Sequence, residues 1–143
     1  MIRLANKQDM EAVYELGSML HDNFRVVNHL EKLMEEEYFK IFVAEEEKKI
    51  VAFLSITELY ETVDILDLFV LKEFRRKHIA SRLINYMIGS VGENVSLFTL
   101  EVSVNNREAI ALYEKFGFDI VCKRLFYYGS TDAYLMGREC NRK

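Results

Sequence analysis

The segment that decides the fold runs from Ile65 to Val91 and reads ILDLFVLKEFRRKHIASRLINYMIGSV. It opens with an apolar run, Ile65 to Leu71, which is typical of a buried strand. It closes with apolar residues at helical spacing, which predict a helix over 76–91. The basic stretch Arg75-Arg76-Lys77-His78 lies where the strand gives way to the helix. The segment therefore predicts a strand, a cationic turn and a helix in succession.

A cationic turn at the start of a helix is electrostatically unfavourable. The helix N-terminus carries partial positive charge, and its first four N–H groups have no partner within the helix. Each exposed cation there costs about 0.3–1 kcal/mol. A bound phosphate would reverse that cost, because the amides and side chains would all face it. An anion site is therefore the favoured interpretation, and a solvated basic turn is the alternative.

Composition limits the kind of protein this is. A chain of 143 residues is expected to form one domain, residues 1–143. Its net charge of −4 argues against nucleic-acid binding, and its apolar stretches are too short to span a membrane. The N-terminus does not resemble a signal peptide, so a cytoplasmic location is expected. Neither a metal site nor a disulfide framework is expected from the cysteines and histidines, which lack the necessary spacing: Cys122, Cys140, His21, His29 and His78.

Apolar periodicity and capping residues divide the rest of the chain into alternating elements. Strands are expected at residues 2–4, 41–45, 50–59, 62–71, 95–104, 118–127 and 133–136. Helices are expected from Met10 to Leu20, from Val26 to Tyr38, over 76–91, and from a cap at Asn105 or Asn106 to Phe116. The order βααβββαβαββ predicts a single α/β domain, with a mixed, twisted sheet of about seven strands flanked by four helices.

A second group of candidate residues comes after the cationic turn. It lies in the strand expected at 95–104 and in the helix that follows this strand. Glu101 interrupts the apolar strand near its C-terminal end, where open α/β sheets bind ligands. A carboxylate among apolar neighbours has a raised pKa and can act as a base near neutral pH. The alternative is a glutamate that points into water at the strand exit. Tyr113 lies on the apolar face of the next helix, where it is either a core residue or a proton donor.

Both segments resemble signatures of the GNAT superfamily of N-acetyltransferases. Residues 75–80, Arg-Arg-Lys-His-Ile-Ala, are similar to its pyrophosphate loop, which usually reads Gln/Arg-x-x-Gly-x-Gly/Ala. The second signature resembles Leu100-Glu101-Val102 through Asn106, followed by Ala109-x-x-Leu112-Tyr113-x-x-x-Gly117-Phe118. The spacing is closest to the group that acetylates the N-terminal amine of ribosomal proteins. The motifs cover about residues 65–119, and the element order extends the resemblance over nearly the whole chain.

The resemblance implies an acetyl-CoA-dependent enzyme that transfers acetyl directly to a primary amine of a small molecule, peptide or protein, as a monomer or homodimer. Glu101 would be the general base, and Tyr113 the acid that protonates the departing thiolate. Asn106 would contact the cofactor or order the loop near its thiol end, and Tyr127 and Tyr128 would lie near the acceptor. The other implied contacts are all with acetyl-CoA: backbone groups of Leu68, Phe69 and Val70 with the pantetheine arm, and amides of Arg75, Arg76, Lys77, His78, Ile79 and Ala80 with the pyrophosphate.

The sequence departs from the family pattern at two positions. His78 replaces the central glycine of the loop, and Lys72 replaces a proline often found after the strand. Glycine permits close backbone approach to phosphate, whereas a histidine can start the helix with an ordinary helical φ, so the loop is expected to form. The substitution keeps open an alternative, a catalytically degenerate acyl-CoA-binding or sensing module. A nucleotide-phosphate enzyme is disfavoured because the P-loop pattern Gly-x-x-x-x-Gly-Lys-[Ser/Thr] is missing.

Overall fold

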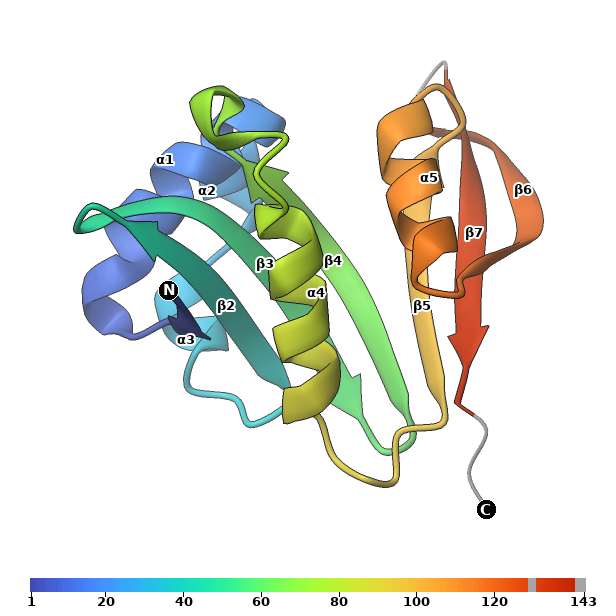
Figure 1. The fold of residues 1–143 in the computed structure, drawn as a ribbon, viewed down its shortest axis with the longest axis horizontal. Helices are drawn as coiled ribbons and strands as arrows, with labels where there is room; N and C mark the ends of the chain where they lie inside the picture. Colours follow the sequence, from blue (N-terminus) through green and yellow to red (C-terminus); the bar gives the residue numbers. More distant parts are fainter. Residues whose placement is uncertain (129–130, 141–143) are drawn as a thin grey trace. The chain divides into compact units, whose positions relative to one another are not determined.

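A computed structural model of the chain describes residues 1–128 and 131–140 and contains a mixed seven-stranded sheet (Figure 1). The strands are hydrogen-bonded in the order β1-β2-β3-β4-β5-β7-β6. They are β1 (Ile2–Leu4), β2 (Phe39–Glu46), β3 (Lys49–Leu59), β4 (Thr62–Val70), β5 (Leu97–Ser103), β6 (Asp119–Tyr128) and β7 (Thr131–Glu139). The helices are α1 (Met10–Leu20), α2 (Phe24–Val27), α3 (Leu30–Leu33), α4 (Ile79–Ser90) and α5 (Arg107–Lys115), with short 3₁₀ turns η1 (Lys7–Asp9) and η2 (Lys72–Phe74). The predicted α/β class and mixed seven-stranded sheet are confirmed.

The chain forms two compact units. Unit 1 comprises Met1–Glu58 and Asp67–Val91, and unit 2 comprises Leu59–Leu66 and Gly92–Lys143. Strand β4 contributes its first part to unit 2 and its last part to unit 1.

In unit 1, helices cover both faces of the β2–β3 hairpin. Phe42 of β2 packs edge-on against Tyr86 of α4, whereas Phe53 of β3 packs against Phe24 of α2. Val43 pairs with Phe53, so Phe42 and Phe53 point to opposite faces. Burial on both faces explains why these two strands read as nearly continuous apolar runs.

The predicted second helix, Val26 to Tyr38, is replaced by two one-turn helices. Between them His29 adopts φ −104° and ψ 75°, which is not a helical conformation. Val26 and Val27, which supported the prediction, are exposed to 74% and 61%. The apolar spacing predicted one long helix incorrectly, because some of the apolar residues that support it do not face the core.

In unit 2, helix α5 covers one face of a small sheet. Strand β4 pairs with β5 in parallel from Thr62↔Leu97 to Ile65↔Leu100, and β7 is antiparallel to both β5 and β6. Asn106 caps α5 by accepting a hydrogen bond from the Ala109 amide at 3.2 Å, as expected. Across residues 1–128 and 131–140, no helix is both long and apolar enough to cross a membrane.

Candidate functional site

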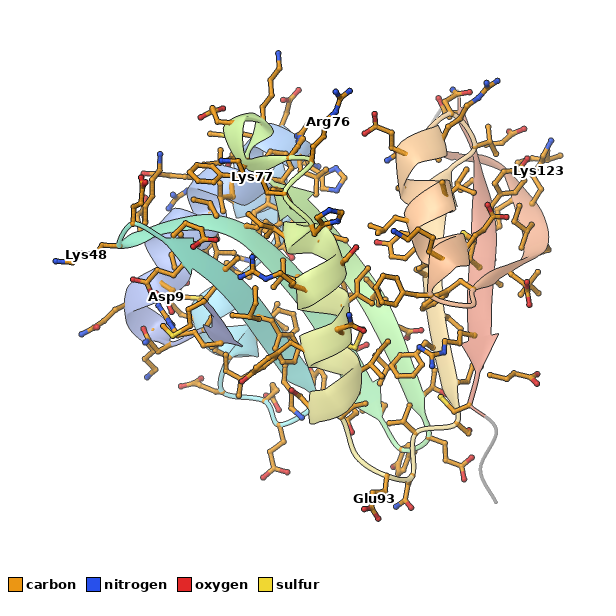
Figure 2. The ribbon with its side chains drawn as sticks, viewed as in Figure 1. Asp9, Lys48, Arg76, Lys77, Glu93 and Lys123 are labelled. Atoms are coloured by element: carbon orange, nitrogen blue, oxygen red, sulfur yellow. The ribbon has the colours of Figure 1, made fainter. Side chains whose placement is uncertain are left out.

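The cationic turn predicted from the sequence lies in unit 1, between η2 and α4. Its ends are fixed by packing: the Leu71 amide donates to the Val51 carbonyl at 2.9 Å, and Ile79 is 2% exposed. Arg75 through His78 are exposed between these anchors. Figure 2 shows Arg76 and Lys77 on this loop at the N-terminal end of α4. The turn is thus an exposed cationic loop whose two ends are fixed by packing.

The loop contains two residues in the left-handed region of backbone space. Arg76 has φ 66°, and His78, which caps α4, has φ 62° and ψ 21°. The expectation that His78 takes an ordinary helical φ is wrong. It adopts the conformation that favours glycine, at the position where the family motif has glycine. This backbone delays the helix, which begins at Ile79 instead of residue 76. The loop therefore forms with a histidine at this position.

Two of the loop cations are held against aromatic rings. The Arg75 guanidinium lies 5.4 Å from the Phe69 ring centroid, and its Nε donates to the Val70 carbonyl at 2.9 Å. The Lys77 ammonium lies 5.1 Å from the Phe74 ring. These contacts orient the charges without neutralising them. A phosphate-bearing group fits this loop, because left-handed turns and helix N-termini direct backbone amides at anions.

The end of β4 leads into this loop and carries the residues implied for the pantetheine arm. Leu68, Phe69 and Val70 are half-buried in unit 1, immediately after Asp67. Asp67 is unexpected: its side chain is 17% exposed and its Oδ1 lies 3.1 Å from Nε2 of His21. Burial raises the pKa of Asp67, and the His21 imidazole partly opposes that rise. No spacing motif in the sequence points to this pair.

Glu101 lies in unit 2, on a strand whose residues alternate between buried and half-buried. Leu100 and Val102 point to the buried face, so Glu101 points to the other one. Its carboxylate has a cationic neighbour, because Arg124 Nε of β6 lies 3.3 Å from its Oε2. Sequence reasoning missed Arg124, which is 49% exposed and reaches Glu101 across the intervening strand β7.

Tyr113 is a core residue of unit 2, only 6% exposed. Its ring lies 5.6 Å from that of Phe118, which in turn contacts Phe98 of β5. Phe98 and Glu101 are three residues apart on β5 and point to opposite faces. Both catalytic candidates thus belong to unit 2.

Asn106 also belongs to unit 2. Its exposed side chain already serves as the cap of α5. Tyr127 and Tyr128 were expected near the acceptor, but their side chains lie outside the described residues.

Comparison with known proteins identifies the family. A model described as "Acetyltransferase (GNAT) family" matches residues 7–118, most of the chain. The chain belongs to this family. It is an N-acetyltransferase of the acetyl-CoA-dependent kind, and the predicted resemblance is confirmed.

Individual relatives agree with the family assignment. The chain is 30% identical to an N-alpha-acetyltransferase of Saccharolobus solfataricus over 96% of its own length and 91% of the relative. It is 29% identical to the [ribosomal protein bS18]-alanine N-acetyltransferase of Escherichia coli, over 59% of this chain and 58% of that protein. The crystal structure of Ard1 from Thermoplasma volcanium superposes with a TM-score of 0.84 at 28% identity, covering 99% of this chain and 98% of that one.

Proposed function

We propose that residues 1–143 act as one acetyltransferase domain that transfers acetyl from acetyl-CoA to the N-terminal α-amine of a polypeptide. Two relatives carry names that specify this type of acceptor. The acid–base chemistry also favours it. An α-amine with a pKa near 8 loses its proton at about pH 7.5 for less than about 1 kcal/mol, whereas a lysine costs about 4 kcal/mol. We expect this activity in the cytoplasm, from a monomer or homodimer, without nucleic-acid or membrane partners.

The loop of unit 1 is proposed to hold the donor. Acetyl-CoA supplies an activated thioester and a pyrophosphate that anchors it. Amides of Arg75 through Ala80 would bind that pyrophosphate, and the left-handed backbone of His78 is the single observation that carries this assignment. Backbone groups of Leu68 to Val70 would bind the pantetheine arm. The half-buried position of these residues, directly before the loop, supports that role.

The residues of unit 2 are proposed to move protons. Glu101 would accept a proton from the acceptor amine through water, and Tyr113 would donate one to the departing thiolate. Tyr113 is held rigidly by packing against Phe118, which suits a fixed donor. Asn106 would act by ordering the loop before α5, where its side chain caps the helix.

The test compares Glu101→Gln with Glu93→Gln, which removes an exposed carboxylate from the same unit. Both variants should gain thermal stability on adding CoA, as expected for a ligand that binds the native state. Glu101→Gln should acetylate a free N-terminal peptide about 10²–10⁴-fold more slowly. Glu93→Gln should match the wild type. A Glu101→Gln enzyme with the wild-type rate from about pH 6 to 9 would reduce Glu101 to a structural residue.

The same assay addresses the alternative of a degenerate acyl-CoA-binding module. A protein that is stabilised by CoA but cleaves no thioester with any amine would be such a module.

A further inference from the structure

An ion pair between Arg124 and Glu101 crosses the sheet of unit 2. Arg124 Nε of β6 lies 3.3 Å from Oε2 of Glu101 on β5. The two strands are not neighbours, because β7 lies between them and is paired with both. The Arg124 side chain is 49% exposed and the Glu101 side chain 24%. An exposed arginine thus extends over a whole strand to reach a more deeply buried carboxylate.

The strand register independently places both side chains on one face of the sheet. Arg124 is paired with Ala133 of β7, and Ala133 is paired with Ser103 of β5. Paired residues point to the same face, and Ser103 shares that face with Glu101, two positions before it. Neighbouring strands are about 4.8 Å apart, so the contact spans about 10 Å of sheet. Position 124 therefore needs a long side chain to make it.

Stability gives little reason for this contact. Ion pairs as exposed as this one add little net stability, because holding two long side chains in one geometry costs entropy. The pair is not needed to hold the strands together either, since the β5–β7 ladder already runs from Leu97↔Glu139 to Ser103↔Ala133. The contact does, however, end on the proposed base. Neighbours that fix the conformation of a reacting side chain are part of a functional site.

We propose that Arg124 is a positioning residue for Glu101 in the acetyl transfer. The inference rests on the proposed function, in which Glu101 accepts a proton from the acceptor amine through water. As the C–N bond forms, this proton leaves nitrogen, the electron pair of the C–S bond leaves with the thiolate, and Tyr113 protonates that thiolate. Solvent then takes the proton from Glu101 and returns one to Tyr113. The carboxylate must keep one orientation for this transfer, and a guanidinium beside its Oε2 restricts its rotation.

Arg124 takes no part in the proton transfer itself. A guanidinium stays protonated in proteins, so it neither accepts nor supplies the proton. Its planar set of N–H groups matches the geometry of a carboxylate, which makes it suited to orienting one. Arg124 therefore acts only through Glu101, and its loss should change the rate only while Glu101 is present.

Lys123 supplies the matched control. It is an exposed cation next to Arg124 on β6 (Figure 2). Its pairing with Tyr134 of β7 places it on the opposite face of the sheet from Arg124. Lys123→Gln thus removes the same charge from the same strand and leaves the ion pair intact.

The experiment compares acetylation of a peptide with a free N-terminus by the full chain and four variants: Arg124→Gln, Glu101→Gln, the double variant and Lys123→Gln. Arg124→Gln should lower kcat by about 10- to 10²-fold, as expected when a reacting group loses its orientation. The acetyl-CoA KM should not change. The double variant should be no slower than Glu101→Gln, because residues that act as a unit are not additive. Lys123→Gln should match the wild type.

Thermal melts separate positioning from a structural role. Arg124→Gln and Lys123→Gln should unfold at similar temperatures and gain the same stability from CoA. An Arg124→Gln protein that melts well below Lys123→Gln would make the pair structural and overturn the inference.

The outcomes also separate this inference from the proposed function. If Glu101→Gln is slow and Arg124→Gln matches the wild type, the positioning role fails and Glu101 remains the base. An equal loss of kcat from Arg124→Gln with and without Glu101 would also overturn the inference. A fully active Glu101→Gln enzyme, or a wild-type protein that acetylates no amine, would overturn both.

Discussion

Replacing Gly17 with alanine tests how tightly α1 packs against Phe24 of α2. A Cβ atom at Gly17 would lie 2.3 Å from Cε2, 2.4 Å from Cδ2 and 2.5 Å from Cγ of Phe24. These distances are about 1 Å shorter than an ordinary carbon contact. Phe24 is 2% exposed, and its ring is held by Tyr14 and Phe53, with centroids 6.3 and 5.8 Å away. Burial and these two neighbouring rings restrict the movement of the Phe24 ring.

Two opposing terms set the magnitude. Alanine in place of glycine within a helix gains about 1 kcal/mol of unfolding free energy. Overpacking a tight core typically costs about 1–3 kcal/mol, and a clash with three atoms of a buried ring belongs at the upper end. Gly17→Ala should therefore lower the unfolding free energy by about 1–2 kcal/mol.

Gly89→Ala is the matched control. Gly89 is an exposed residue of α4, and a Cβ there meets no atom of the described residues within 4 Å. This variant should gain about 0.5–1 kcal/mol. Urea denaturation measures both. The Phe24 amide donates to the His21 carbonyl at 3.0 Å, so displacement of the ring should also move the turn at His21. A Gly17→Ala protein as stable as Gly89→Ala would refute this reasoning.

Three further substitutions test the stability of the fold and the candidate functional site. Asp9→Asn should cost about 2 kcal/mol at neutral pH, because Asp9 binds Arg3 through hydrogen bonds of 2.8 and 3.0 Å. Those bonds lower the pKa of Asp9, so its contribution to the unfolding free energy is present above the ordinary aspartate pKa and is lost as the pH falls. Urea denaturation should therefore show a difference in stability between variant and wild type near neutral pH that becomes smaller near pH 3. His78→Gly should raise the unfolding free energy by about 0.5–1 kcal/mol in thermal melts, since it relieves a left-handed φ, and kcat at saturating acetyl-CoA should hold; a loss of stability would contradict this. Tyr113→Phe keeps the ring packing and should preserve stabilisation by CoA while lowering kcat, so an unchanged kcat would remove Tyr113 from the mechanism.

Sequence patterns predicted what depends on local periodicity. The strands and the cap of α5 by Asn106 follow from short-range rules. The start of α4 was missed because the positive φ angles of Arg76 and His78 are not encoded in their residue types. The family motif, which has glycine at position 78, was the available signal.

The site was predicted less completely than the fold because its contacts join distant parts of the chain. His21 and Asp67 are 46 residues apart, and neither belongs to a spacing motif. Arg124 reaches Glu101 only because β7 lies between β5 and β6 in the sheet, an order that hydrophobic patterning does not determine. Side-chain partners such as these are set by strand order and register, which become known only with the fold.

We propose that N-terminal α-amines are the acceptors of this chain. The most direct test incubates it with acetyl-CoA and a lysine-containing peptide whose N-terminus is free, beside the same peptide with its N-terminus blocked. Mass spectrometry locates the acetyl group, and a thiol reagent counts the CoA released. We expect one acetyl group on the N-terminal nitrogen, one CoA thiol released for each, and no reaction of the blocked peptide. Equal acetylation of lysine in the blocked peptide, or no acetylated peptide at all, would contradict the account.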